Sequence, residues 1–157
     1  MVLQLPAGRL RRACLAGLLA RCYAAYDRMD VLLTYALFAE DVEWHLLEGL
    51  PGDTDVLRGR DAVIGFYNEV TADWDHRIRF DGLEDHGDGR VSVHATNVLT
   101  SRATGLSSEL RDIDELHFRR GRVVLGREVL DETHGNPWRG LTADSQSTST
   151  PPTSRTP

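Results

Sequence analysis

Three polar side chains interrupt otherwise apolar faces of predicted strands, and they are the side chains of this 157-residue chain best suited to chemistry. Asp114 alternates with Leu116 and Phe118, so the three side chains share one face of a strand. His76 and Asn97 interrupt the apolar faces of two other predicted strands in the same way. Because burying an unpaired carboxylate is costly, Asp114 must be protonated, paired with another group or functional. This makes Asp114 the most informative residue of the sequence.

The strands that carry these residues follow three predicted helices. Apolar side chains spaced three and four residues apart predict helices, whereas alternation of apolar and polar residues predicts strands. The expected elements are, in chain order, a helix ending near Tyr26, a short helix capped by Asp30, a strand over 41–47, a helix opened by Asp61, and strands near 76–84, 91–100, 108–119 and 122–131. This order predicts an α+β fold in which a cone-shaped, curved antiparallel sheet wraps around three helices.

The composition divides the chain into three parts. Residues 1–8 are expected to form a loose N-terminal arm, and residues 9–140 a single domain. Residues 141–157 are rich in Ser, Thr and Pro and contain no bulky apolar residue after Leu141. Because burial cannot offset the entropy of ordering such a segment, it is expected to be a disordered tail.

Charge and composition exclude several classes of function. The formal net charge of −6 argues against a nucleic-acid partner, because phosphate binding requires a clustered excess of basic residues. All 18 basic residues are Arg. Without Lys, the chain can neither form the internal Schiff base of pyridoxal phosphate enzymes nor supply the Lys of a phosphate-binding loop.

Cysteine spacing and hydropathy favour a soluble protein of the cytoplasm. Cys14 and Cys22 lie eight residues apart in one predicted helix. This spacing separates their Cα atoms by roughly 12 Å, too far for a disulfide. The apolar run over 13–20 is short and ends at Arg21, so it does not fit a signal peptide. No run approaches the ~18 apolar residues of a membrane span, and no membrane partner is expected.

Three segments of the chain resemble the nuclear-transport-factor-2-like superfamily, and in particular its SnoaL-like branch. They are YALFAEDVEWH (35–45), LRGRDAVIGFY (57–67) and GRVVLGREVLD (121–131). The resemblance covers about residues 12–132 and implies a cone of curved antiparallel sheet closed by three helices, with a pocket at its mouth. It also implies a homodimer, because dimers are frequent in this superfamily. The superfamily includes steroid isomerases, epoxide hydrolases, polyketide cyclases, dehydratases and members without catalytic activity, so fold likeness alone does not fix the function.

Two of these activities fit the sequence poorly. Steroid isomerases use a Tyr on the first helix, an Asp base on the first strand and an Asp in the oxyanion hole. The matching positions hold Cys22, Leu46 and Asp114, so only the last of these groups is kept. Epoxide hydrolases of this fold polarise the epoxide with an Arg, and the matching position holds Ala95.

The pattern of SnoaL-like cyclases fits better. These enzymes place a His and an Asp on the last two strands, where this chain has Asp114 and Glu128. Two carboxyl groups that face one apolar cavity push their pKa values apart, which leaves one acid and one base. The resemblance therefore implies isomerisation, ring closure or dehydration of a small hydrophobic carbonyl compound, such as a polyketide or terpenoid, without a metal or other cofactor.

In this interpretation Asp114 donates a proton or binds the oxyanion, Glu128 is the base and Asn97 is a positioning donor. The side chains expected to shape the substrate pocket are Tyr26, Trp44, His45, Phe66, Tyr67, His76 and Phe118.

Each of these residues also has a purely structural interpretation. Asp114 fits a carboxylate paired within the core, and Asn97 fits a hydrogen-bonded core amide. Alternation along its own strand places Glu128 on the outer face, so only the resemblance places it in the pocket. His45 would need a bulge in the first strand to turn inward. The histidines show no ligand spacing, so no metal site is expected.

Three function hypotheses follow. The first is the cofactor-free acid–base enzyme described above. The second is a non-catalytic domain that binds a small molecule or mainly dimerises, and the third is a subunit of a larger complex tethered by the Ser/Thr/Pro-rich tail. An enzyme needs both carboxyl groups to face an open cavity, whereas a pure dimerisation domain would fill its cone with Trp44, Phe66 and Phe118.

Overall fold

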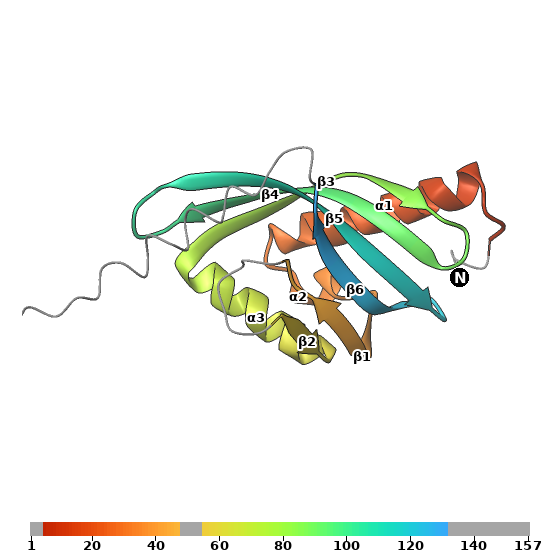
Figure 1. Cartoon of the computed structure of the whole chain (residues 1–157), viewed down its shortest axis with the longest axis horizontal. Coiled ribbons are helices and arrows are strands. Elements are labelled where there is room, and N and C mark those ends of the chain that lie inside the picture. The colour runs from red at the N-terminus through yellow and green to blue at the C-terminus, as the bar shows by residue number, and fades with distance from the viewer. Residues whose placement is uncertain (1–4, 48–54, 132–157) are drawn as a thin grey trace, which may run out of the picture.

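The computed structural model describes residues 5–47 and 55–131, which fold into the predicted α+β arrangement (Figure 1). Its elements are α1 (Arg9–Tyr26), α2 (Val31–Thr34), β1 (Phe38–His45), β2 (Val56–Arg58), α3 (Arg60–Asp73), β3 (Trp74–Asp85), β4 (Arg90–Ser101), β5 (Ser107–Arg119) and β6 (Arg122–Leu130). The predicted order of helices and strands is confirmed, with β2 as an additional short strand. The expected tail over 141–157 and half of the expected arm lie outside the described residues.

The six strands form one sheet in the order β2-β1-β6-β5-β4-β3. Because β2 and β3 remain as edges, the sheet is curved but not closed into a barrel. Four neighbouring pairs are antiparallel, whereas β1 and β6 are parallel. This parallel pair corrects the expectation of a wholly antiparallel sheet. The reason is that β1 and β6 are joined through α3 and three long strands rather than by a hairpin, so no tight turn forces them to run in opposite directions.

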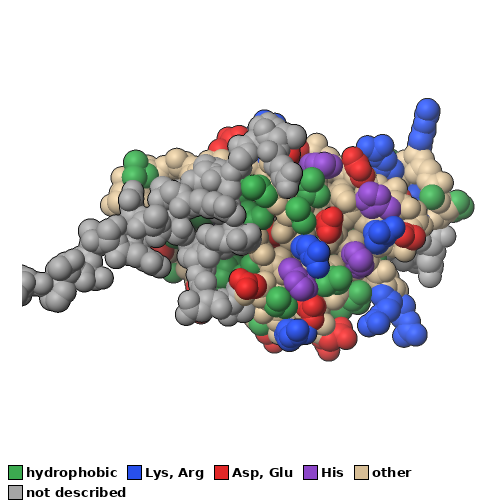
Figure 2. Space-filling model, in the orientation of Figure 1, with side chains coloured by type: hydrophobic (Ala, Val, Ile, Leu, Met, Phe, Trp, Pro, Cys, Tyr) green, Lys and Arg blue, Asp and Glu red, His purple; other side chains and the backbone are tan. Residues whose placement is uncertain are grey.

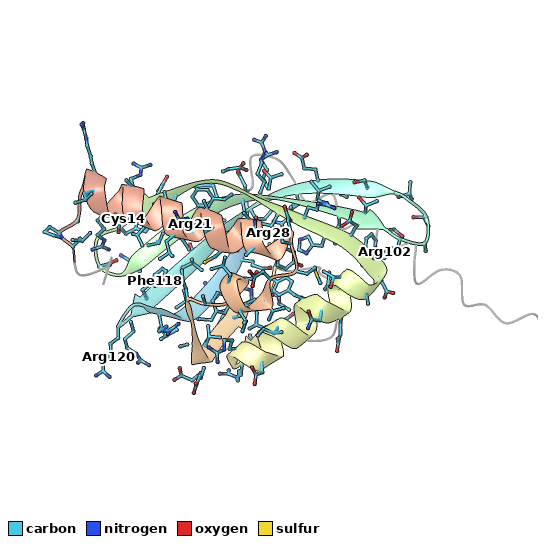
Figure 3. The ribbon with its side chains drawn as sticks, turned by 180° about the vertical axis from the view of Figure 1, so that it is seen from behind. Cys14, Arg21, Arg28, Arg102, Phe118 and Arg120 are labelled. Carbon is cyan, nitrogen blue, oxygen red and sulfur yellow. The ribbon has the colours of Figure 1, made fainter. Side chains whose placement is uncertain are left out.

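The helices cover one face of the sheet, and Figure 3 shows α1 and α3 lying across it. The apolar stripe of α1 includes Leu15, Leu19 and Cys22, which are buried, while Cys14 and Arg21 are exposed on the other side of the helix. Asp30 caps α2 by accepting a hydrogen bond from the Leu33 backbone N–H at 3.1 Å, as predicted. The core therefore lies between these helices and the helix-facing side of the sheet.

Strand alternation correctly predicts most of the inward-facing side chains. On β4, the apolar face that includes Asn97 is buried throughout. Thr96 lies on the opposite face of β4, away from the helices, yet it is also fully buried. Its hydroxyl lies under Arg79, whose Nη2 donates to it at 3.1 Å, and it donates to Asp81. The side chains of Arg79 and Asp81, both on β3, thus shield Thr96 from solvent.

A one-residue bulge in β6 sets the direction of Glu128. In the pairing with β5, His117 lies opposite Leu125 but Phe118 lies opposite Val123, so Val124 has no partner. The bulge reverses the alternation, and the residues beyond it that face the helices are even-numbered. Glu128 therefore shares the helix-facing side with its cross-strand partner, Asp114. The outward placement predicted from alternation alone is wrong, and the inward placement implied by the resemblance is confirmed.

The other face of the sheet is not covered by described helices. Figure 2 shows side chains of both charges and several histidines interspersed with apolar ones over this face. His45 and His94 belong to this face. The Nε2 of His45 lies 2.8 Å from Oε1 of Glu43, and the Nε2 of His94 lies 3.7 Å from Oε1 of Glu84. Among the described residues, none of the helices has the length and apolar character that a membrane crossing requires.

Candidate functional site

A cavity of about 90 Å³ lies between the helices and the sheet. Most of its wall is aromatic or aliphatic. The three helices and the strands β1 and β3–β6 all contribute side chains to it. The aromatic side chains of the wall are Tyr23, Tyr26, Tyr35, Phe38, Trp44, Phe66 and Tyr67. Three carboxyl groups, those of Asp112, Asp114 and Glu128, interrupt this wall and are called the carboxyl cluster below.

Glu128 is held by three hydrogen-bond donors from three different segments. The indole Nε1 of Trp44 donates to Oε1 at 2.8 Å, the backbone N–H of Leu47 donates to Oε2 at 3.0 Å, and the hydroxyl of Tyr67 also donates to Oε1. Burial raises the pKa of Glu128, and the three donors act in the opposite direction. Of the carboxyl cluster, Glu128 is thus the member whose ionised form is best solvated by the protein.

The position of Trp44 depends on a glycine in the neighbouring strand. Gly126 lies opposite Trp44 in the parallel β1–β6 pair, and a Cβ added to it would stand only 2.1 Å from the indole ring. The indole therefore crosses β6 at the one residue without a side chain. The stacked ring of Phe38, 5.1 Å away, supports the indole on the other side.

Asp114 lies directly opposite Glu128 on the neighbouring strand. Side chains paired in this way have Cβ atoms only about 5 Å apart. Asp114 accepts a hydrogen bond from the hydroxyl of Tyr23, but burial and the nearby Glu128 charge raise its pKa to about 7. A carboxyl group with this pKa exchanges its proton readily near neutral pH.

Asp112 lies two residues earlier on the same face of β5. The Nδ2 of Asn97 donates to its Oδ1 at 2.8 Å. Burial and the charges of Asp114 and Glu128 raise the pKa of Asp112 to about 9, so this carboxyl group carries a proton at neutral pH.

A chain of hydrogen bonds continues from Asn97 across the cavity wall. His76 Nε2 lies 2.8 Å from Asn97 Oδ1, and His76 Nδ1 lies 2.8 Å from the hydroxyl of Tyr26. Burial lowers the pKa of His76, so the ring is neutral at neutral pH. Because an amide oxygen only accepts, Nε2 carries the ring proton and Tyr26 donates to Nδ1. His76 and Asn97 thus position Asp112. Both ring nitrogens of His76 and both the oxygen and the nitrogen of the Asn97 amide take part in hydrogen bonds.

Eight of the ten site residues expected from the sequence line the cavity. They are Tyr26, Trp44, Phe66, Tyr67, His76, Asn97, Asp114 and Glu128. The expectation for the other two is corrected. His45 lies on the opposite face of β1, where it contacts Glu43, because β1 has no bulge near His45 that would turn it inward. Phe118 packs against the core near the β5–β6 turn that carries Arg120 and does not line the cavity (Figure 3).

The sequence analysis missed Tyr23 and Asp112, although both left a signal. Asp112 and Asp114 are two residues apart on one strand and so share a face. Tyr23 follows Leu19 by four residues and so lies on the buried stripe of α1. Cys22 had been matched to the position of the catalytic Tyr of steroid isomerases, one residue away from the Tyr that does reach Asp114.

The arrangement supports proton transfer rather than metal or phosphate binding by the described residues. No Arg or Lys is among the described residues that line the cavity, and no group of three or more described His, Cys, Asp or Glu is arranged as a metal site. At neutral pH the carboxyl cluster holds an ionised Glu128, a protonated Asp112 and an Asp114 between the two states. A base, an acid and a hydrogen-bond donor therefore face one apolar space.

Comparison with known proteins agrees with this fold. A nuclear-transport-factor-2-like protein from Burkholderia thailandensis is 27% identical, with a TM-score of 0.66 over 83% of this chain and 95% of that one. A protein of the same type and of unknown function from Burkholderia pseudomallei is also 27% identical, with a TM-score of 0.62 over 73% and 88%. A candidate polyketide cyclase from Xanthomonas campestris is 19% identical, with a TM-score of 0.61 over 78% and 94%.

The sequence comparisons give one family. No curated protein matches the chain. The model of the SnoaL-like domain matches residues 19–126, which is well over half of the sequence and includes most of the cavity wall. The protein therefore belongs to the SnoaL-like domain family, within the nuclear-transport-factor-2-like superfamily.

Proposed function

We propose that this domain is a cofactor-independent acid–base enzyme that isomerises, cyclises or dehydrates a small hydrophobic carbonyl compound such as a polyketide or terpenoid. The observation that carries the proposal is the direct opposition of Asp114 and Glu128 on neighbouring strands in the wall of an apolar cavity. The similarity in fold to a candidate polyketide cyclase agrees with this substrate class.

The contacts of Asp114 and Glu128 suggest which of the two carboxyl groups takes the proton from the substrate. Three donors stabilise ionised Glu128 and make it a weak base, so its main effect is to keep the pKa of Asp114 near 7. Asp114 is then the group that takes a proton from the carbon next to the substrate carbonyl. The C–H electron pair moves into the new C=C bond, and the carbonyl oxygen becomes an enolate oxygen. Protonated Asp112 faces the same space and can donate a hydrogen bond to that oxygen.

The test is exchange of α-protons for deuterium, because it detects enolisation whatever the final product. Small cyclic ketones and β-diketones are incubated with the protein in D₂O, and exchange is followed by NMR. We expect Asp114→Asn to slow exchange by at least about 100-fold. Glu115→Gln is the matched control, because it replaces a carboxyl group by an amide in the same way and Glu115 is exposed on the other face of the same strand.

The pH dependence gives a second readout. Because the ionised form of Asp114 takes the proton, exchange should rise with pH and level off above about 7. Exchange that is absent for every compound, or that is equal in Asp114→Asn and the wild type, would contradict the proposal.

The second candidate is a non-catalytic domain that binds a small molecule. The observation in its favour is that every member of the carboxyl cluster already has a hydrogen-bond partner within the protein. A binding domain would keep its affinity for a neutral ligand in Asp114→Asn and show no α-proton exchange. The same two measurements therefore separate the two functions.

A further inference from the structure

The charge of the cavity has a consequence for the kind of molecule it can hold. Asp112 and Asp114 are buried and Glu128 is partly buried, and no Arg or Lys is among the described residues that line the cavity. Of the described residues in the wall, His76 is the one basic side chain, and it is neutral and hydrogen-bonded through both ring nitrogens. Excess charge in the empty cavity is therefore negative, and the low dielectric of the interior leaves it poorly screened.

Three side-chain donors of the cavity wall that could receive an anionic ligand are already engaged. The hydroxyl of Tyr23 donates to Asp114, and both the hydroxyl of Tyr67 and the indole of Trp44 donate to Glu128. An anion could use these three donors only by breaking their bonds to the carboxyl groups, and it would meet Glu128 as a like charge. The described cavity wall thus disfavours carboxylates and phosphates.

The rest of the wall is complementary to an organic cation. Phe66 and Tyr67 lie edge to face with ring centroids 5.3 Å apart, and Tyr26 meets Tyr67 edge to face at 5.9 Å. All three rings line the cavity, and because they are tilted against one another, their faces do not share one direction. The negative faces of aromatic rings attract ammonium groups, and the attraction is strongest where water is excluded.

We propose that the cavity binds small hydrophobic ammonium ions, with the charged nitrogen beside Asp112 and Asp114 and the hydrocarbon part against the aromatic wall. This inference rests on the proposed function and deepens it, because it identifies the substrate as a carbonyl compound that also carries a basic nitrogen. An ammonium group supplies the positive charge that the described cavity wall lacks.

Binding of a cation should also release protons. A positive charge beside Asp112 and Asp114 favours their ionised forms. In the empty cavity at neutral pH, Asp112 holds its proton and Asp114 is about half protonated. The other titratable groups of the wall are Cys22, Tyr23 and Tyr26 on α1, Tyr35, Tyr67 on α3, His76 on β3 and Glu128 on β6. Burial keeps the thiol and the four hydroxyls protonated and His76 neutral at pH 7, so the released protons come from the carboxyl cluster.

The experiment compares three probes of similar size by titration calorimetry with the full chain at pH 7. Phenyltrimethylammonium and tert-butylbenzene have nearly the same shape and differ by one positive charge, and benzoate carries the opposite charge. We expect phenyltrimethylammonium to bind at least about tenfold more tightly than tert-butylbenzene, and benzoate to bind most weakly. Heats measured in phosphate and in Tris, which differ in ionisation enthalpy, should show proton release with phenyltrimethylammonium alone.

Variants assign the preference to the carboxyl cluster. Asp112→Asn and Asp114→Asn keep the shape of the side chain but leave no group that can ionise beside the cation, so each should reduce the preference for the cation severalfold. Glu115→Gln replaces a carboxyl group by an amide in the same way on the exposed face of β5 and should leave the preference unchanged. Two separate cluster variants guard against the misfolding of one.

Three results would overturn the inference. They are equal or tighter binding of tert-butylbenzene, tightest binding of benzoate, and a preference for the cation that both cluster variants retain. The titration involves no turnover, so its failure leaves α-proton exchange free to support the proposed function. Cation binding without α-proton exchange would be the opposite case, in which the enzyme proposal fails and this inference stands.

Discussion

Replacing Gly126 with Ala tests how the cavity wall is built. The new Cβ would lie 2.1 and 2.2 Å from two carbons of the Trp44 ring, whereas an ordinary contact begins near 3.4 Å. The ring would have to move by more than an ångström, and the stacked ring of Phe38 blocks one direction. Overpacking of this kind costs about 1–3 kcal/mol, and loss of the indole's hydrogen bond to ionised Glu128 costs about 1.5–3 kcal/mol more. We expect Gly126→Ala to lower the free energy of unfolding by about 2.5–6 kcal/mol.

Urea denaturation followed by far-UV circular dichroism measures this effect. Gly65→Ala is the matched control, because Gly65 lies within α3 and an added Cβ there meets no heavy atom within 4 Å. That substitution should be neutral or stabilise the protein by up to about 1 kcal/mol, since Ala favours the helix. A Gly126→Ala variant as stable as the wild type would show that the indole of Trp44 does not cross β6 at Gly126. The account of how Glu128 is held would then be wrong.

Two further predictions concern stability. Folding raises the pKa of Asp112 from its ordinary 3.8 to about 9, so the folded state binds a proton that the unfolded state has lost, and stability should fall as pH rises through this window. Between pH 7.5 and 9, His76 is almost entirely neutral in both states and Asp114 has lost most of its proton. In this window we expect a loss of about 1 kcal/mol per pH unit that is much smaller in Asp112→Asn, and an equal slope in both proteins would contradict the assignment. Arg11→Ala should lower the free energy of unfolding by about 3–5 kcal/mol, because it removes the guanidinium that lies 2.8 Å from the buried carboxylate of Asp85. The control is Arg9→Ala, at an exposed position, which should change stability by less than about 0.5 kcal/mol. Thermal or urea unfolding measures both variants.

Local patterns in the sequence were sufficient for the elements and for most of the inward faces. Alternation depends only on strand geometry, and it correctly identified His76, Asn97 and Asp114 as polar residues among buried apolar ones. The cap at Asp30 is likewise a contact between residues three positions apart. Such features are encoded within a few residues of the chain, and a single sequence reveals them.

Features that depend on pairing between distant strands were harder to predict. The parallel contact of β1 with β6 joins segments about 80 residues apart, and no local pattern distinguishes it from an antiparallel contact. The bulge at Val124 is a similar case, because it is defined by the register of β6 against β5. The close approach of Trp44 to Gly126 likewise depends on the pairing of β6 with β1. A single inserted residue reverses the side to which Glu128 points, so the alternation of β6 gave the wrong face.

The charge states of the site depend on contacts that are more distant still. The sequence predicts acidic residues on one face, but the order in which they ionise is set by donors from other elements. Glu128 receives three such donors, from Trp44, Leu47 and Tyr67, whereas Asp114 receives one from Tyr23. Burial and the charge fixed at Glu128 together raise the pKa values of Asp112 and Asp114, and acid and base then coexist at neutral pH. Removing a donor from Glu128 should therefore change the pKa of Asp114. The proton chemistry of the cavity is thus a property of the whole carboxyl cluster rather than of any one of its residues.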